Sequence, residues 1–192
     1  MNNPYYMSVH PNPYFSYVPM YNWGNNWGSD YWNMSNGASY TNPFSPNQNS
    51  QDMTYSPSLK DHGREPFVVN LNQAAKHNNN FRTAIWTGNH MQLTLMSINV
   101  GEDIGLENHP NVDQLIRIER GQGLVQMGKN KNNLNFVNIV GEDDAIIVPA
   151  GTWHNVINTG HTSLKLSTIY APPNHPFGTV HRTKAEAEAA EH

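Results

Sequence analysis

Residues 101–123 read GEDIGLENHPNVDQLIRIERGQG, and the fold prediction rests on this stretch. Glu107 and His109 are two positions apart, so on an extended strand both side chains point to the same face. A Pro-Asn turn follows, and the chain returns along a second segment that begins near Gln114. We therefore expect Gln114 to lie across from His109 on the neighbouring strand.

A second block of the same kind follows at residues 149–158, which read PAGTWHNVIN. Its Pro-x-Gly sequence is typical of a turn, and His154 then opens a new segment rich in apolar residues. If that segment lies beside the first one, His154 joins Glu107, His109 and Gln114 on one inner face. Carboxylate, amide and imidazole groups are N and O donors that Mn, Fe, Ni or Zn accept, so the pattern favours a divalent metal site.

The rest of the chain after residue 65 consists of short segments rich in Ile, Val, Leu or Thr, bounded by Gly, Asn, Asp or Pro. This punctuation is typical of strands joined by β-turns. We expect one or two helical turns at 71–77 and strands at 67–69, 81–87, 90–100, 114–120, 123–127, 134–140, 145–148, 153–158 and 164–170. Many short strands with almost no helix indicate an all-β sandwich or barrel.

The two blocks resemble the two sequence motifs of the cupin superfamily, in matching order. The matching residues include His109, Gly121, Pro149, Gly151, His154 and Asn158. The resemblance covers residues 66–175 and implies a double-stranded β-helix, also called a jelly-roll barrel. The chain is most similar to small single-domain cupins related to mannose-6-phosphate isomerase. That likeness implies a metal-dependent isomerase acting on a small polar substrate, such as a sugar or sugar phosphate.

Two positions depart from the family pattern. Glu107 stands where the family has its first histidine, and Gln114 stands where the family has its glutamate. The resemblance implies that Glu107, His109, Gln114 and His154 hold the metal, with the neutral amide as the weakest ligand. Two histidines and one carboxylate are the facial-triad composition that suits Fe(II), which makes an oxygenase a second hypothesis. A barrel that binds no metal is the alternative to both.

Several charged residues near these blocks have competing interpretations. Asp113 is expected to cap a turn, and it is also a rival oxygen ligand. Arg82, Arg117 and Lys165 lie within expected strands, where a cation that faced the pocket could bind an anionic substrate. Charged side chains on a barrel strand more often face outward, so an outward position is the default expectation. The sequence assigns no catalytic residue.

We expect residues 176–192 to form a C-terminal arm with a short helix. His175 and His181 are expected to lie beyond the barrel, on an arm over its mouth or over a partner subunit, or on a free tail. Residues 184–191 have high helix propensity but no apolar stripe beyond alanine. We expect a short helix there that is loosely docked or solvated.

Residues 1–60 differ sharply in composition from the rest of the chain. They carry three charged residues but eight of the nine tyrosines and three of the five tryptophans. With almost no aliphatic residues, such a segment cannot bury enough surface to offset its ordering entropy. We predict a disordered, self-associating tail, joined to the barrel by a linker at 60–65. The composition of this tail resembles that of segments of spore-coat proteins. A third hypothesis is therefore a non-catalytic module that binds coat or surface-layer proteins through residues 1–60.

The overall composition excludes several other functions. The net charge is -4 and the eleven basic residues are scattered, so we expect no nucleic-acid partner. The absence of cysteine excludes disulfides and thiolate metal sites. No apolar run approaches the roughly 18 residues of a membrane span, and no secretory signal is visible. We expect a soluble cytoplasmic protein, with the spore coat as the alternative location, and a homodimer formed through an edge strand.

Overall fold

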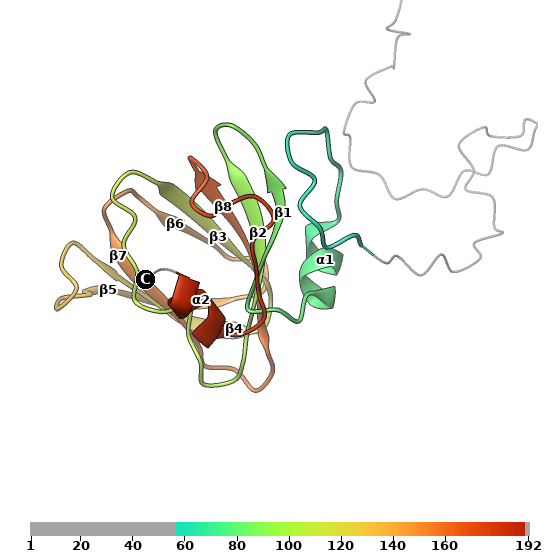
Figure 1. Cartoon of the computed structure of the whole chain (residues 1–192). Coiled ribbons are helices and arrows are strands. Elements are labelled where there is room, and N and C mark those ends of the chain that lie inside the picture. The colour runs from blue at the N-terminus through green and yellow to red at the C-terminus, as the bar shows by residue number, and fades with distance from the viewer. Residues whose placement is uncertain (1–56, 191–192) are drawn as a thin grey trace, which may run out of the picture. The chain divides into compact units, whose positions relative to one another are not determined.

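Two antiparallel sheets face each other in the computed structural model, which describes residues 57–190 (Figure 1). The predicted disordered tail and its coat-protein contacts fall mainly on residues 1–56, outside the described residues. One sheet has six strands in the order β6-β3-β8-β2-β1-β9, and the other has three in the order β5-β4-β7. Within residues 57–190, no helix has the length and apolar character that crossing a membrane requires.

The helices and strands begin and end close to the Gly, Asn, Asp and Pro residues that the sequence analysis took as turns. Their bounds are α1 Leu71–His77, β1 Arg82–Thr87, β2 Gln92–Ile98, β3 Asp113–Arg120, β4 Gln122–Gly128, β5 Phe136–Gly141, β6 Ala145–Val148, β7 Trp153–Asn158, β8 Leu164–Ala171, β9 Val180–His181 and α2 Lys184–Ala190. The predicted all-β architecture with a short C-terminal helix is confirmed. The strand expected at residues 67–69 is wrong, because Val68 is 98% exposed and pairs with no strand.

The interior of the barrel has an apolar end and a polar end. Strand register shows the division, because Ile118 lies opposite Leu166 while Gln114 lies opposite Tyr170 and Gln92 follows on β2. Side chains alternate between the two faces of a strand, so these residues all point inward. The apolar end forms the main core. Burying polar groups at the other end costs free energy unless they find partners, so that end is where a bound group is expected.

Helix α1 covers the outer face of the six-stranded sheet over β3, β8 and β2 (Figure 1). Ala74 and Ala75 of this helix pack with Ile85 and Leu95 in a second apolar cluster. The helix begins where the Asn70 side chain accepts a hydrogen bond from the backbone of Gln73, as an N-cap residue does. This second cluster leaves the barrel interior free for other side chains.

The segments before α1 and after β8 are held against the barrel. Asp61, in the expected linker, accepts hydrogen bonds from the hydroxyl of Thr87 at 2.6 Å and the amide of Gly178 at 2.9 Å. The two residues of β9 pair with β1, so the C-terminal arm continues the six-stranded sheet. Of the two alternatives expected for the C-terminal helix, docked or solvated, the structure shows the docked one, because Ala187 of α2 is buried in the main core. Nζ of Lys184, the first residue of α2, also donates a hydrogen bond to Asp103 at 2.6 Å.

Candidate metal centre

Glu107 and His154 face each other across a short antiparallel pairing. The amide of each donates to the carbonyl of the other at 3.0 Å, which joins the segment before β3 to the edge of β7. Residues directly opposite in such a pair carry their side chains on the same face, about 5 Å apart at Cβ. As a result, Oε1 of Glu107 lies 3.4 Å from Nε2 of His154. The strand of His154 thus lies beside the first segment, which is the condition that the sequence analysis set for His154 to join the group.

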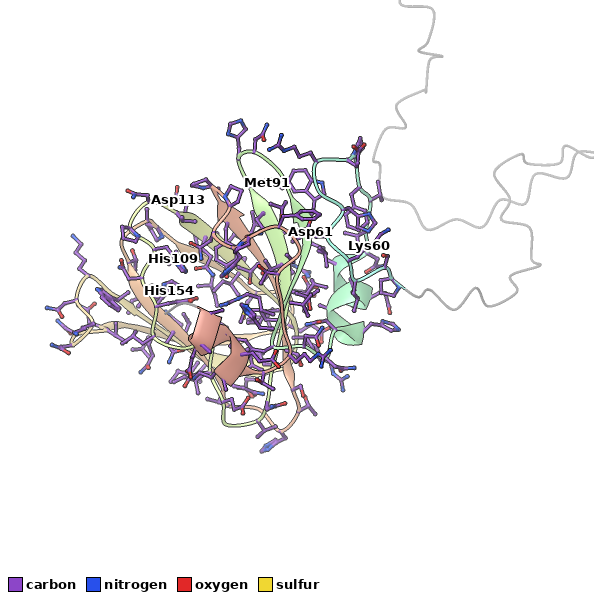
Figure 2. The ribbon with its side chains drawn as sticks, in the orientation of Figure 1. Lys60, Asp61, Met91, His109, Asp113 and His154 are labelled. Carbon is purple, nitrogen blue, oxygen red and sulfur yellow. The ribbon has the colours of Figure 1, made fainter. Side chains whose placement is uncertain are left out.

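His109 reaches the same point from two residues further along the chain. Its carbonyl accepts a hydrogen bond from the amide of Gly151 at 2.8 Å, in a turn where Gly151 has a φ of 76°. Glycine adopts that left-handed conformation without steric cost. Nε2 of His109 lies 3.6 Å from Oε2 of Glu107, and the rings of His109 and His154 are 5.6 Å apart between centroids. Figure 2 shows the two histidines close together inside the barrel.

The spacing of these three groups suits a shared metal ion. One ligand atom from each of Glu107, His109 and His154 lies within 4.8 Å of the other two. An ion bound at about 2.1 Å from each ligand separates two ligand atoms by about 3.0 Å at a right angle and about 3.4 Å at a tetrahedral angle. The separations of 3.4 and 3.6 Å involving Glu107 are therefore within a few tenths of an ångström of a coordinating arrangement.

The state of the two imidazoles fits a ligand role. Nδ1 of His154 lies 3.0 Å from the carbonyl of Thr152, and because a carbonyl can only accept, Nδ1 carries the proton. Nε2 is the ring nitrogen that faces Glu107, 3.4 Å from its Oε1. Nε2 of His109 and Nε2 of His154 are sealed from solvent and have no hydrogen-bond partner within residues 57–190. A carbonyl on the far nitrogen is the usual support of a metal-binding histidine, and the sequence did not reveal it.

The carboxylate is held in its charged form. Burial acts to raise the pKa of Glu107, but contacts with His109 and His154 and the positive charge of Arg82 outweigh it, and the pKa falls well below its usual range. Nη2 of Arg82 lies 3.8 Å from Oε2 of Glu107. A carboxylate must be deprotonated to bind a metal ion, so this electrostatic setting favours binding.

Gln114 does not lie where the sequence analysis placed it. It pairs with Val148 on β6 and Tyr170 on β8, not with His109, because the turn after His109 carries the chain from one sheet to the other. The side chain is nonetheless buried and on the inner face, and its Oε1 has no hydrogen-bond partner in the described part of the chain. A role as fourth ligand stays a prediction.

The other charged candidates differ in whether they lie near the cluster of Glu107, His109 and His154. Oδ1 of Asp113 accepts a hydrogen bond from the amide of Ala150 at 2.9 Å, so this residue holds the turn before His154. Arg117 forms ion pairs with Glu119, which lies on the same strand, and with Asp143, which lies in the turn between β5 and β6. Lys165 lies on the outer face and donates to the hydroxyl of Ser97 at 2.9 Å. Of the three basic residues considered on strands, Arg82 is the one whose side chain lies near the cluster, at Glu107.

Sequence reasoning missed Gln92 of β2 and Tyr170 of β8, which lie around the cluster, and it named an arm over the barrel mouth as one of the alternatives for His175. The ring of Tyr170 lies edge-on to His109 at 5.8 Å and to His175 at 5.0 Å. Gln92 clamps the backbone of His175, donating to its carbonyl and accepting from its amide, both at 2.9 Å. Burial and the charge of Arg82 lower the pKa of His175 to about 3, so the ring is neutral at physiological pH. The sequence did carry one signal for these residues, which was the presence of polar residues at inward positions of β2 and β8, two otherwise apolar strands.

Comparison with known proteins places this arrangement in a family. Residues 94–170 match the family described as Cupin domain, and this range contains all four expected ligands. The chain is 60% identical over 178 residues to the uncharacterized protein YrkC of Bacillus subtilis (strain 168), covering 93% of this chain and 94% of YrkC. It is 44% identical over 115 residues to the uncharacterized protein L612 of Acanthamoeba polyphaga mimivirus, covering 59% of this chain and 70% of L612. The crystal structure of BH2720 from Bacillus halodurans matches with a TM-score of 0.68 and 62% identity, over 68% of this chain and 99% of that one.

The buried neutral His175 predicts a pH dependence of stability. Its pKa of about 3 in the folded protein lies below the usual 6.5, so the unfolded chain binds more protons between these values and stability falls as the pH drops through them. Replacing His175 by Asn should make the loss of unfolding free energy between pH 7 and pH 4.5 smaller by about 2 to 3 kcal/mol at most. Urea unfolding at both pH values measures this, with the exposed His161→Asn as the matched control. Equal losses in wild type and His175→Asn would contradict the burial of a neutral ring.

Proposed function

This chain belongs to the cupin family, and from that premise we propose that it is a metal-dependent enzyme acting on a small polar substrate. The observation that carries the proposal is the convergence of Glu107, His109 and His154 at coordinating separations. Two imidazole nitrogens of this group are sealed from solvent without a hydrogen-bond partner among the described residues. Native proteins rarely leave buried polar atoms unpaired, so a bound ion is the simplest partner for both.

Each residue of the group has a distinct task. Glu107 supplies negative charge, His154 is oriented by the carbonyl of Thr152, and His109 is held by the turn at Gly151. We propose Gln114 as a weak fourth ligand that water or substrate can displace. When bound, a divalent ion would polarise a substrate carbonyl or hydroxyl oxygen or, as Fe(II), support reaction with dioxygen.

The reaction class follows from the acids and bases available. An isomerase moves a proton between adjacent carbons and needs a base whose pKa lies near the working pH. Glu107 belongs to the ligand group and has a lowered pKa, and the pKa of His175 is about 3, so neither described residue is a good proton acceptor. The two-histidine, one-carboxylate composition instead suits Fe(II). We therefore place oxygenase-type chemistry first and sugar or sugar-phosphate isomerisation second.

Metal content tests the proposal directly. Purified wild-type protein should carry close to one equivalent of Fe, Mn, Ni or Zn by elemental analysis, and His154→Ala should lose most of it because one imidazole ligand is gone. His161→Ala removes an exposed histidine and should leave metal content unchanged. Iron as the bound metal, with oxygen consumption, supports the oxygenase; another metal with no oxygen consumption supports the isomerase. Negligible metal in wild type would contradict both.

A structural role in a spore coat or another surface layer is a second candidate function. Its support is the aromatic, nearly uncharged composition of residues 1–60, and the 178-residue similarity to YrkC extends into this segment. Deleting residues 1–56 removes the segment but keeps Asp61 and its contacts with the barrel. We expect the truncated protein to keep its metal content and to lose attachment to the coat or surface fraction, as measured by fractionation of cells and spores. Unchanged distribution would leave a cytoplasmic enzyme as the better proposal.

We also propose a homodimer. β5 and β6 are edges of their sheets, and they carry Phe136, Ile139 and Ile147 with exposures of 51%, 71% and 59%. Exposed apolar residues on a sheet edge are suited to pairing with a second chain. Light scattering of the protein lacking residues 1–56 should give the mass of two chains, and Ile139→Asp should shift it toward one. A single-chain mass for the unmutated protein would contradict the proposal.

A further inference from the structure

An apolar groove lies outside the barrel, where the segment before α1 passes the hairpin of β1 and β2. The groove, which we call the Trp86 groove, has a volume of about 320 Å³. Its apolar walls are formed by Pro66, Phe67, Val69, Trp86, Met91 and Leu93. Phe67, Val69 and Leu93 also pack against the second apolar cluster, so the floor of the groove continues the packing under α1. A concave apolar surface of this kind is typical of a binding site.

Two aromatic side chains of the Trp86 groove are fixed in place. Nε1 of Trp86 donates a hydrogen bond to the carbonyl of Glu65 at 2.8 Å. A Cβ atom at position 88 would lie 2.3 Å from the indole, so Gly88 leaves the room that the ring occupies. The ring of Phe67 stacks on His62, with 4.1 Å between the centroids. A surface that is ordered before binding loses little conformational entropy when a ligand arrives, so the groove is pre-organised.

The sequence carries a repeated motif that suits such a groove. Asn-Pro occurs three times in the chain, always within residues 1–56 and always before an aromatic residue, as Asn3-Pro4-Tyr5, Asn12-Pro13-Tyr14 and Asn42-Pro43-Phe44. Proline fixes φ and favours an extended chain, and grooves lined by aromatic residues are common binding sites for such segments. The groove has the volume of about ten water molecules, which is enough for a proline ring and part of an aromatic ring.

The rim of the Trp86 groove matches the uncharged character of this motif. Arg64 and Glu65 line the groove with opposite charges, and both residues are exposed. The two charges offset each other, so the rim gives no preference for an anion or a cation. The amide side chain of asparagine has both donor and acceptor atoms, so it can form a hydrogen bond with either rim residue.

We propose that the Trp86 groove binds an Asn-Pro-aromatic segment of a second copy of this chain. Each chain has three such motifs but one such groove within residues 57–190. At least two motifs of every chain are therefore left for the grooves of other chains. This inference goes beyond the proposed enzymatic function and does not depend on the metal site.

The point at which residues 1–56 join the described chain supports this exchange between copies. They end beside Pro57, two residues before Leu59, which packs against the same apolar cluster as Phe67 and Leu93. When one motif docks on a second chain, the remaining motifs of both chains come close to further grooves. Their effective concentration then rises, so that individually weak contacts produce stable self-association.

Binding of a short peptide tests the groove. The probe is a fluorescently labelled peptide of residues 41–50, TNPFSPNQNS, in which Phe44 is the single aromatic residue. The receptor is the full-length protein with Tyr5→Ser, Tyr14→Ser and Phe44→Ser, so that its own motifs do not compete. Fluorescence anisotropy should show saturable binding. Phe44→Ser in the peptide should weaken binding by about 10-fold or more, because it removes the main apolar contact.

Substitutions in the receptor locate the site. Trp86→Ala should weaken peptide binding by about 30-fold or more, as for a central aromatic contact, and Met91→Glu by about 10-fold. Met91, labelled in Figure 2, is 41% exposed just before β2, and Val100 is 55% exposed just beyond the other end of that strand. Val100→Glu is therefore the matched control and should leave binding unchanged. If Trp86→Ala unfolds, Met91→Glu decides, because its side chain is already exposed.

Light scattering of the wild-type protein tests whether the occupant comes from a second copy. The average mass should rise with protein concentration, and Met91→Glu should remove most of that rise. No peptide binding, equal binding of the Phe44→Ser peptide, or undiminished binding by Met91→Glu would overturn the groove. Peptide binding with a wild-type mass that does not change with concentration would indicate docking within one chain and overturn the second copy. Metal content should be equal in all variants, and its absence would overturn the proposed enzyme but not this inference.

Discussion

The reciprocal backbone pairing of Glu107 and His154 is the constraint on which the whole site depends. Two hydrogen bonds of 3.0 Å fix the register between segments that are far apart in sequence. A slip of one residue would turn one of the two side chains out of the barrel, because side chains alternate between faces. His109 follows two positions later on the same face, and the turn at Gly151 returns the chain to the same point. One register therefore determines where three ligand groups meet.

The interior of the barrel has apolar side chains toward one end of its strands and polar side chains toward the other. Residues such as Ile118 and Leu166 fill one end with apolar side chains, whereas Gln92, Gln114 and Thr168 occupy inward positions toward the other end of the same sheet. Buried polar groups without partners reduce the stability of the empty protein. A bound ion would recover part of that free energy, because any group that binds only the folded state stabilises it. The C-terminal segment contributes His175 to the polar end, where its ring lies edge-on to Tyr170.

Much of this arrangement could be predicted from local sequence, and the remainder could not for physical reasons. Strands such as β6 and β7 are bounded by Gly, Pro and Asp, so their limits were visible. The strand partners of Gln114 could not be predicted, because a turn after His109 can return the chain to either sheet. Only tertiary packing decides which sheet the chain joins. The position of His175 depends on its clamp by Gln92, a long-range contact without periodic signal. The docking of α2 depends on Ala187 and on the ion pair of Lys184 with Asp103, and neither residue is marked by a periodic apolar pattern.

Anomalous diffraction from crystals of the full-length protein soaked in Mn²⁺ or Fe²⁺ tests the central claim most directly. The account predicts one strong anomalous peak inside the barrel, about 2.0 to 2.3 Å from a carboxylate oxygen of Glu107 and from Nε2 of both His109 and His154. Its distance from Oε1 of Gln114 would also show whether the amide is a ligand. A barrel with no peak at that point, or with its metal held elsewhere by other residues, would contradict the account.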